Sequence, residues 1–323
     1  MSTPTHSRTL HVVMAFDQGY LPGAIVTLAS AIHNLAPGAF LDIVVLDCGL
    51  ENPESINLGL QPLPKERFKI QVLPMDMDLI QNIPVVINRL STSAFSVLKL
   101  QTLFPQLDRV LFLDADIIVN RDLSPLAGLD MQGCPIAAVQ DPIAKVISYD
   151  IQNCETLGLD PQARYFNSGF VLFDLACWRR MDWESRLSQT IENSQIERTY
   201  NDQSFLNVTF SKKWLPLPRK WNRLIVLKPG HFPLCPLFPS VIHATWKFKP
   251  WQFSETGARG IIKKYYHYLR LTRFEFPDTA LSTHSFSYLK KGELRRMIRF
   301  YLSEFGFDPW IYRFKALLRK ALP

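Results

Sequence analysis

Apolar residues in the first part of the chain follow two different spacings. Short runs rich in β-branched residues predict three buried strands at residues 10–16, 41–47 and 68–73. Apolar side chains at helical spacing predict helices at residues 24–34 and 89–104. Strands that alternate with helices are typical of an open, mainly parallel, Rossmann-like α/β sheet, whose ligands bind at the carboxyl ends of the strands.

The second half of the chain continues this alternation less regularly. The spacing predicts a strand at residues 136–140 and a polar turn followed by a strand within residues 166–174. It also predicts helices at residues 178–193 and 200–210. Residues 214–240 are rich in proline and are predicted to be irregular.

An acidic pair lies inside one of the most apolar segments. Residues 109–119 predict a single buried strand that contains Asp114 and Asp116. Two carboxylates in an apolar segment repel each other unless they are neutralised, and residues i and i+2 of a strand point the same way. Both could therefore reach one hard cation, Mg²⁺ or Mn²⁺, of the kind that also binds substrate phosphates. The alternative is a pair of solvated acids at a strand end.

The net charge of +7 is concentrated at the carboxyl end of the chain. Residues 259–323 hold 14 Lys and Arg against 5 Asp and Glu, so the remaining residues 1–258 carry 22 bases and 24 acids. The tail also places apolar residues on helical stripes, which predicts basic amphipathic helices that suit an anionic membrane surface. The alternative is that these helices pack on the preceding domain. No nucleic-acid module accompanies the charge, so nucleic acid is not an expected partner.

Cysteine usage and hydropathy bear on the compartment. The five cysteines are scattered and lack metal-ligand spacing, which favours a reducing compartment over a disulfide framework or a zinc site. The polar residues 1–8 predict no signal peptide, and no apolar run is long enough to cross a bilayer. We therefore expect a cytoplasmic protein.

Seven short motifs occur in order along the chain. They lie at residues 15–20, 99–100, 113–116, 165–169, 201–207, 221–222 and 243–251. Over residues 10–252 the set resembles glycosyltransferase family 8, which includes bacterial lipopolysaccharide glucosyl- and galactosyltransferases and glycogenin. The resemblance implies a GT-A fold over residues 1–258, a UDP-hexose donor, a glycan or glycolipid acceptor, and transfer with retention of anomeric configuration.

The resemblance also implies a divalent cation, usually Mn²⁺, with Mg²⁺ as the alternative. Asp114, Asp116 and His243 would be its protein ligands. A histidine beside two carboxylates suits Mn²⁺ better than Mg²⁺. Lys249 would contact the diphosphate and stabilise the departing UDP.

Further donor contacts follow from the same motifs. Asp17 and Tyr20 would contact uridine, and Lys99 would reach the donor phosphate or sugar. Asp202 would bind donor-sugar hydroxyls and Gln203 would sit beside the anomeric carbon. The remaining expected donor-binding residues are Ala15, Ala115, Asn167 and Ser168.

No carboxylate fills the role of a nucleophile, because Gln203 is a poor one. We therefore expect front-face substitution, in which the acceptor attacks from the side that UDP leaves. Gln203 or a backbone carbonyl would stabilise the cationic sugar, and Asp202 and Lys249 complete the expected catalytic set. Two positions depart from the family pattern: Trp246 stands where glycine is usual, and Gly19 replaces a polar residue.

Three other classes compete with this interpretation. A phosphohydrolase of the haloacid dehalogenase type is disfavoured, because its acidic motif lies near the start of the domain. A catalytically inactive nucleotide-sugar-binding protein on the same fold is favoured only by Trp246. A glycogenin-like enzyme that glucosylates itself would need an exposed tyrosine such as Tyr200. We expect a hexosyltransferase of lipopolysaccharide or surface polysaccharide synthesis.

Overall fold

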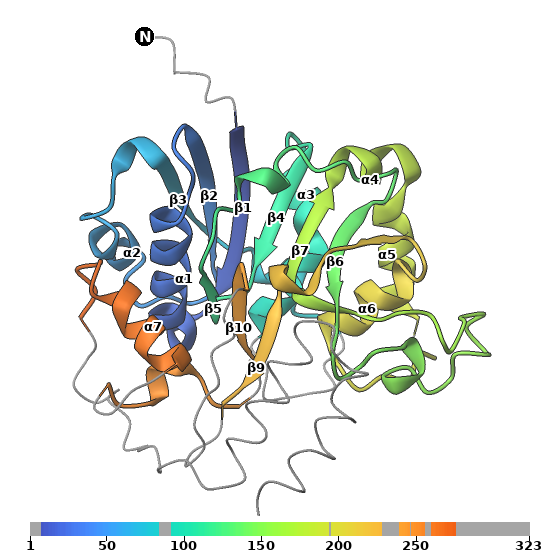
Figure 1. Ribbon diagram of the computed structural model, residues 1–323. Coiled ribbons are helices and arrows are strands. Elements are labelled where there is room, and N and C mark those ends of the chain that lie inside the picture. Colours follow the sequence, from blue (N-terminus) through green and yellow to red (C-terminus); the bar gives the residue numbers. More distant parts are fainter. Residues whose placement is uncertain are drawn as a thin grey trace, which may run out of the picture.

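The structure is a computed structural model that describes residues 8–83, 92–193, 195–227, 239–245, 247–255 and 260–275. It contains a large and a small β-sheet (Figure 1). The large sheet consists of β1 (Arg8–Phe16), β2 (Ala39–Asp47), β3 (Phe68–Pro74), β4 (Arg109–Leu113), β6 (Ile136–Gln140), β7 (Phe166–Asp174) and β8 (Trp214–Pro216). The small sheet consists of β5 (Ile117–Val119), β9 (Arg223–Val226) and β10 (Val241–Thr245).

The strand order of the large sheet is β3-β2-β1-β4-β7-β6-β8. Neighbours from β3 to β4 run parallel, and β6 pairs in parallel with β8. β7 runs antiparallel to both of its neighbours, β4 and β6. The amino end of β7 therefore lies at the same edge of the sheet as the carboxyl ends of β1 and β4. A cavity lies at this edge, where a mainly parallel α/β sheet is expected to bind its ligand.

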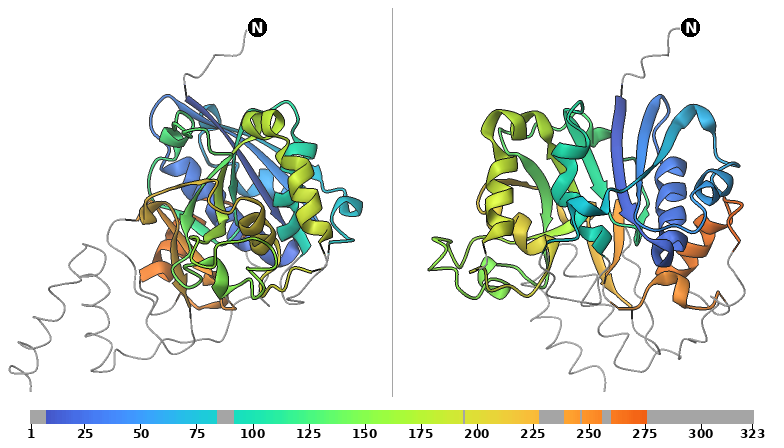
Figure 2. Two further views of the ribbon diagram at one scale, coloured as in Figure 1. Left: turned by 90° about the vertical axis from the view of Figure 1, so that its right-hand side faces the viewer. Right: turned by 180° about the vertical axis from the view of Figure 1, so that it is seen from behind.

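Helices cover both faces of the large sheet (Figure 2). Alternate residues of β1 pack on opposite sides: Leu10, Val12 and Met14 face one helical layer, and Val13 faces the other. The first layer holds α1 (Leu21–His33) and α2 (Glu54–Gly59), and α7 (Gly260–Leu269) packs on α1. The second layer holds α3 (Leu100–Leu103), α4 (Leu175–Met181), α5 (Trp183–Glu192) and α6 (Asp202–Thr209).

The single strand predicted for residues 109–119 is wrong. The chain forms β4, turns at Asp114–Asp116, and continues as β5 in the small sheet. Asp114 N–H donates to the Gly169 carbonyl of β7 at 2.9 Å, whereas the Asp116 carbonyl accepts from Ala244 N–H of β10 at 2.9 Å. The two acids thus stand where the backbone changes from one sheet to the other, and pairing with distant strands decides the break.

Other expectations differ from the structure in detail. Residues 178–193 form two helices rather than one, because Asp182 between α4 and α5 adopts a left-handed backbone with φ 53°. Residues 92–99 form a 3-10 helix that leads into α3. The proline-rich region predicted as irregular contains β8 and β9. Residues 84–91, 228–238 and Trp246 lie outside the described residues.

Helix α7 is the described start of the predicted basic tail. Its side chains Ile261, Ile262 and Tyr265 are buried, and Tyr265 Oη donates to the Pro22 carbonyl of α1 at 3.0 Å. Asn34 Nδ2 at the end of α1 donates to Tyr268 Oη at 2.8 Å. The apolar side of this helix is therefore covered by the protein itself. The predicted helices of residues 276–323 lie outside the described residues, and no described helix is long and apolar enough to span a membrane.

Candidate active site

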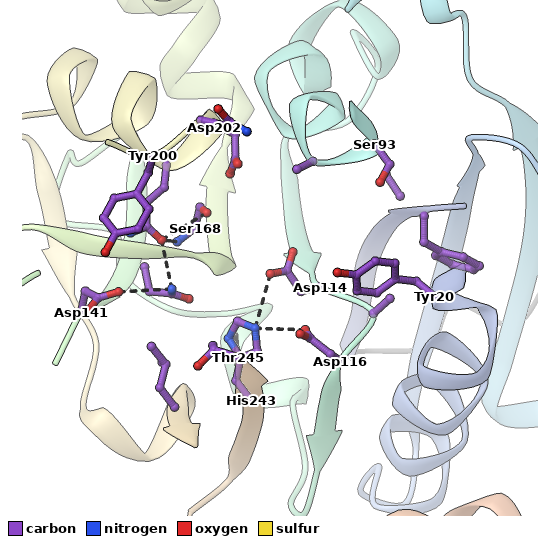
Figure 3. Close-up of a pocket in the computed structure, with 18 of the residues that line it drawn as sticks. Tyr20, Ser93, Asp114, Asp116, Asp141, Ser168, Tyr200, Asp202, His243 and Thr245 are labelled. Atoms are coloured by element: carbon purple, nitrogen blue, oxygen red, sulfur yellow. Dashed lines mark hydrogen bonds and ion pairs between the residues drawn. The ribbon is translucent and has the colours of Figure 1, made fainter. Parts of the chain in front are cut away.

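A cavity opens at the edge where β1 and β4 end and β7 begins (Figure 3). Its polar lining comes from segments far apart in the sequence. Tyr20 follows β1, Asp114 follows β4, Ser168 belongs to β7, and Asp202 begins α6. The remaining lining residues are Ala15, Phe16, Ser93, Ala94, Ala115, Asp116, Asp141, Ile143, Asn167, Tyr200, Asn201, Gln203, Leu224, His243, Thr245 and Lys249.

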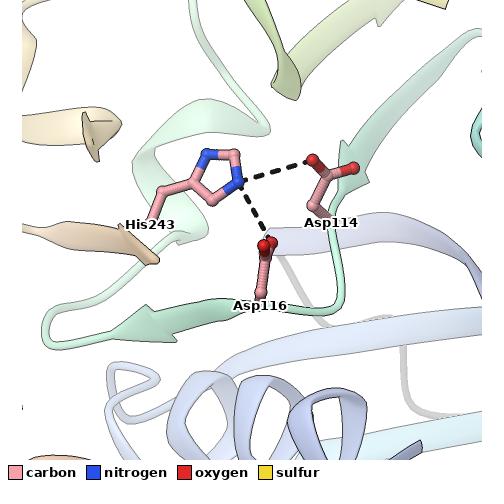
Figure 4. Close-up of side chains that lie close together, drawn as sticks. All are labelled: Asp114, Asp116 and His243. Atoms are coloured by element: carbon pink, nitrogen blue, oxygen red, sulfur yellow. Dashed lines mark ion pairs between the residues drawn. The ribbon is translucent and has the colours of Figure 1, made fainter. Parts of the chain in front are cut away.

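Asp114, Asp116 and His243 meet at the floor of this cavity (Figure 4). His243 Nε2 lies 3.4 Å from Asp114 Oδ2 and 3.0 Å from Asp116 Oδ1. One ligand atom from each residue lies within 4.8 Å of the others, which is a suitable spacing for one shared cation. Asp116 Oδ1 is buried, and apart from its ion pair with His243 it accepts no hydrogen bond from the described part of the chain. A cation would satisfy this oxygen, so the three residues fit a divalent metal.

Two glycines allow this cluster to be compact. A Cβ at Gly169 of β7 would lie 2.3 Å from Asp114 Oδ2 and 2.3 Å from His243 Cε1. A Cβ at Gly23 of α1 would lie 2.3 Å from the Ala115 carbonyl oxygen, so glycine at this position lets the acidic turn pack against the helix. All three distances are far below a normal contact, so a larger residue at either glycine would displace the turn, Asp114 or His243.

The electrostatics of the cluster are dominated by Asp116, which is 6% exposed. Burial would raise the pKa of Asp116, but His243 and Lys249 hold it well below its usual value. Burial likewise would lower the pKa of His243, but Asp116 and Asp114 raise it to about 9. Lys249 Nζ forms an ion pair with Asp116 Oδ2 and donates to the Ala244 carbonyl at 3.2 Å. This ammonium therefore lies beside the cluster.

Tyr20 and Asp17 occupy the turn after β1. Tyr20 lines the cavity, and Lys249 Nζ lies 5.6 Å from its ring centroid. Its pKa is raised by burial and lowered by Lys249, with a net upward shift. Asp17 accepts from Gly19 N–H at 3.0 Å and does not line the cavity. Ala15 and Ala115 also line it.

A set of amide side chains forms the opposite wall. Gln203 Oε1 accepts from Asn167 Nδ2 and from Ser168 N–H, both at 3.0 Å. Asn207 fixes the helix that carries Gln203, because its side chain bonds both the N–H and the carbonyl of Phe166 at 2.8 Å. The wall is thereby built on β7 and α6, which are rigid elements, rather than on loops.

Comparison with known proteins identifies the group to which this cavity belongs. A family model for Glycosyl transferase family 8 matches residues 11–255. The chain belongs to glycosyltransferase family 8. The resemblance drawn from the seven motifs is therefore confirmed, and the chain is a glycosyltransferase.

Individual relatives of this family 8 chain are distant. A lipopolysaccharide 1,2-glucosyltransferase of Escherichia coli K12 is 26% identical over 255 residues, which are 76% of this chain and 73% of that protein. General stress protein A of Bacillus subtilis is 22% identical over 82% of this chain and 94% of its own length. A probable glycosyl transferase Gly of Streptococcus gordonii is 32% identical, but the match spans 46% of this chain and 20% of that protein.

Solved structures establish the fold of the family 8 chain. The galactosyltransferase LgtC, in complex with donor and acceptor sugar analogues, matches with a TM-score of 0.67 and 23% identity. The match covers 84% of this chain and 98% of that chain. The predicted GT-A fold, with a mainly parallel sheet between helices, is therefore confirmed.

Some cavity residues carry no signal in the sequence, and two expected residues, Asp17 and Lys99, do not line the cavity. Lys99 ends the 3-10 helix before α3 and does not line the cavity. Asp141 and Ile143 line it from the segment after β6, and Tyr200 lines it just before α6. Asp141 and Ile143 lie in none of the motifs, because only pairing of β6 with the distant β7 brings their segment to the cavity edge. Tyr200 directly precedes the motif at residues 201–207.

Asp202 provides a pH-dependent test of the family 8 site. Burial, with a contribution from Asp114, raises its pKa to about 7, against an unperturbed 3.8. The folded chain therefore holds a proton that the unfolded chain has lost, and the free energy of unfolding falls as the pH rises from about 4 to about 7. The full loss is at most about 4 kcal/mol, from about three pKa units.

We expect Asp202→Asn to remove this loss. Relative to the unchanged chain, its free energy of unfolding should be about 2–4 kcal/mol higher at pH 8 and little changed at pH 4. Urea denaturation in the presence of a chelator at both pH values measures the difference. An effect of equal size at both pH values would show that the carboxyl proton is not its cause.

Proposed function

We propose that the chain transfers a hexose from a UDP-sugar to a glycan or glycolipid acceptor, with the help of a divalent cation and with retention of anomeric configuration. The observation that carries this proposal is the cluster of Asp114, Asp116 and His243 at the floor of a cavity in a family 8 chain. Two carboxylates and one imidazole favour Mn²⁺ over Mg²⁺. When bound, the cation supplies positive charge to the diphosphate of the donor.

We match the other parts of the donor, namely diphosphate, uridine and sugar, with different walls of the cavity. Lys249 lies beside the cluster and would bind the diphosphate, which adds charge stabilisation to the leaving group. Ala15 in β1 and Tyr20 in the turn after it line the cavity and would hold uridine, with Asp17 supporting the turn. Asn167, Ser168, Asp202 and Gln203 lie on the opposite wall and would hold the sugar.

The proposed reaction is a front-face substitution. The acceptor hydroxyl attacks the anomeric carbon on the side that UDP leaves, and its proton passes to the departing phosphate oxygen. Asp202 and the amide of Gln203 orient the sugar through its hydroxyls, and Lys249 stabilises the negative charge that develops on UDP. In the structure, Gln203 Oε1 already accepts three bonds, from Asn167 and from the N–H and Oγ of Ser168. This favours a backbone carbonyl over Gln203 as the stabiliser of the cationic sugar.

The acceptor class is proposed from relatives. The Escherichia coli relative is a lipopolysaccharide 1,2-glucosyltransferase, and it shares three quarters of its length with this chain. We therefore propose an acceptor from lipopolysaccharide or surface polysaccharide synthesis at the inner face of the cytoplasmic membrane. We propose glucose or galactose as the sugar, because the Escherichia coli relative is a glucosyltransferase and LgtC is a galactosyltransferase.

Release of UDP tests the enzyme class without knowledge of the acceptor. We expect Mn²⁺-dependent release of UDP from UDP-glucose or UDP-galactose, because water can replace the acceptor slowly. A chelator should stop the release, and added Mn²⁺ should restore it. If calorimetry detects UDP binding but neither sugar is hydrolysed, a strict acceptor requirement or another sugar follows. If UDP does not bind, the chain is an inactive member of the fold.

Residues 276–323 are proposed to bind an anionic membrane surface. Residues 276–323 hold 9 Lys and Arg against 4 Asp and Glu, and each base near such a surface contributes about 1 kcal/mol. We expect deletion of residues 276–323 to lower binding to vesicles that contain anionic lipid by at least about tenfold, whereas binding to neutral vesicles stays weak for both chains. Equal sedimentation of both chains with anionic vesicles would disprove the proposal. The deleted segment begins after α7, so the shortened chain keeps this helix and its contact with α1.

A further inference from the structure

Four buried side chains form a continuous hydrogen-bonded chain across the back of the cavity. His243 Nδ1 lies 3.1 Å from Asn222 Oδ1, and Asn222 Nδ2 donates to Asn167 Oδ1 at 2.8 Å. Asn167 Nδ2 then donates to Gln203 Oε1 at 3.0 Å. Each of the four residues is no more than 8% exposed, so water does not compete for these bonds. This series of hydrogen bonds connects His243, an expected metal ligand, with Gln203, the residue expected beside the anomeric carbon.

Two backbone N–H groups determine which side chain donates and which accepts in each of these hydrogen bonds. Ser168 N–H can only donate, so the Gln203 atom that it contacts at 3.0 Å is the oxygen. Gly169 N–H also can only donate, so the Asn167 atom at 3.1 Å is likewise the oxygen. Asn167 therefore turns its amino group to Gln203 and its oxygen to Asn222. Asn222 must then donate to Asn167, which leaves its own oxygen for His243.

The fixed direction has a consequence at each end. At one end, the Asn222 oxygen requires a proton on His243 Nδ1, so Nε2 is the nitrogen free to bind a cation between Asp114 and Asp116. At the other end, the Gln203 oxygen is held against β7, and the Gln203 side chain also bonds to Tyr165. Tyr165 Oη donates its proton to Asp150 at 2.6 Å, so it accepts from the Gln203 amino group.

We propose that Asn222 is a positioning residue that acts on both halves of the active site. It holds His243 in the tautomer that binds the cation, and it fixes Gln203 at the donor sugar through Asn167. This inference rests on the proposed function, since it assigns a cation to the cluster and a sugar to the wall. Asn222 itself lies outside the set of cavity-lining residues.

The test compares two variants of Asn222. Asn222→Ala removes both bonds, so we expect the Mn²⁺ affinity to fall about 10- to 100-fold and kcat to fall by a similar factor. Asn222→Asp keeps an oxygen for His243 but has no N–H for Asn167. It should restore Mn²⁺ affinity to within about threefold of the unchanged chain, while kcat stays low. Titration of Mn²⁺ by electron paramagnetic resonance and kinetics of UDP release provide the two readouts.

A double variant tests the connection to Gln203. If Asn222 acts on Gln203 through Asn167, adding Asn222→Ala to Asn167→Ala should lower kcat at saturating Mn²⁺ no further than Asn167→Ala alone. Asn57→Ala on the surface helix α2 is the matched control and should change neither readout. Circular dichroism and thermal unfolding confirm that each variant is folded.

The outcomes separate this inference from the proposed function. If the unchanged chain binds no Mn²⁺ and releases no UDP, the proposed function fails. If it does both and Asn222→Ala does both equally well, the inference alone is overturned. The inference is also overturned if Asn222→Asp and Asn222→Ala lower Mn²⁺ affinity to the same extent, because the effect then does not depend on an oxygen that faces His243.

Discussion

Gly169→Ala is expected to lower glycosyl transfer at least about a hundredfold while the chain remains folded. The added Cβ would lie 2.3 Å from Asp114 Oδ2 and from His243 Cε1. The Asp114 side chain is 40% exposed and can rotate away, whereas His243 is 3% exposed and confined. Rotation of Asp114 relieves only one of the two overlaps, so the confined His243 must shift as well. Both movements displace residues of the cluster, so a large part of the cost falls on metal binding.

Measurement of Mn²⁺ affinity, UDP release and thermal unfolding checks this expectation. Gly128→Ala is the matched control, because a Cβ at Gly128 would meet no atom within 4 Å. The control should retain native Mn²⁺ affinity and turnover. If a folded Gly169→Ala chain bound Mn²⁺ as tightly as the control, the close approach of β7 to the cluster would have no part in metal binding.

Asp116→Asn is expected to destabilise the metal-free chain by about 3–5 kcal/mol, whereas Asp114→Asn should change its stability by less than about 1 kcal/mol. Both variants remove one negative charge from the cluster and should weaken Mn²⁺ binding. Asp116 is 6% exposed and pairs with the buried Lys249, so its loss leaves a buried cation without its partner. The Asp114 side chain is 40% exposed, so water screens its ion pair with His243, whose Nε2 lies 3.4 Å from Asp114 Oδ2.

The pH dependence of this effect has a defined sign. The pKa of Asp116 is lowered in the folded chain, so its stabilising effect is present above about pH 4 and is lost as the pH falls below that. The pKa of His243 is raised from 6.5 to about 9, so its share is complete below about pH 6.5 and disappears as the pH rises through 9. The difference between the two variants should therefore be largest between about pH 4 and 6.5. Denaturant unfolding in chelator across this range would show it, and equal stability of both variants at pH 5 would refute the assigned role of Asp116.

Local patterns in the sequence predicted elements whose structure is local. Helices α1 and α6 have clear apolar spacing, and both form close to the predicted residues 24–34 and 200–210. The break at Asp114–Asp116 had no such signal, because β4 and β5 share one apolar pattern and differ only in their partner strands. The partner β10 lies more than 120 residues further along the chain, so no local rule could place it.

The residues of the site also divide into those with a local signal in the sequence and those without one. The two acids of the cluster were recognisable as acids in an apolar segment, but His243 entered only through the family motif. Asn222 lies in a region predicted to be irregular, and its bonds to Asn167 and His243 span 55 and 21 residues. The motif at residues 221–222 marks Asn222, but nothing in the sequence identifies its partners. These become visible only when the fold brings the distant segments together.

The change of sheet at residues 114–116 makes a bound cation a cross-link. Asp114 extends from the large sheet, whereas His243 belongs to the small one, whose strands are three to five residues long. Without a cross-link, such a short sheet can open locally before the rest of the chain unfolds. A cation that binds only the closed arrangement opposes that opening in proportion to its concentration. The concentration of the cation would then determine how slowly the backbone amides of the small sheet exchange with solvent, as well as the rate of glycosyl transfer.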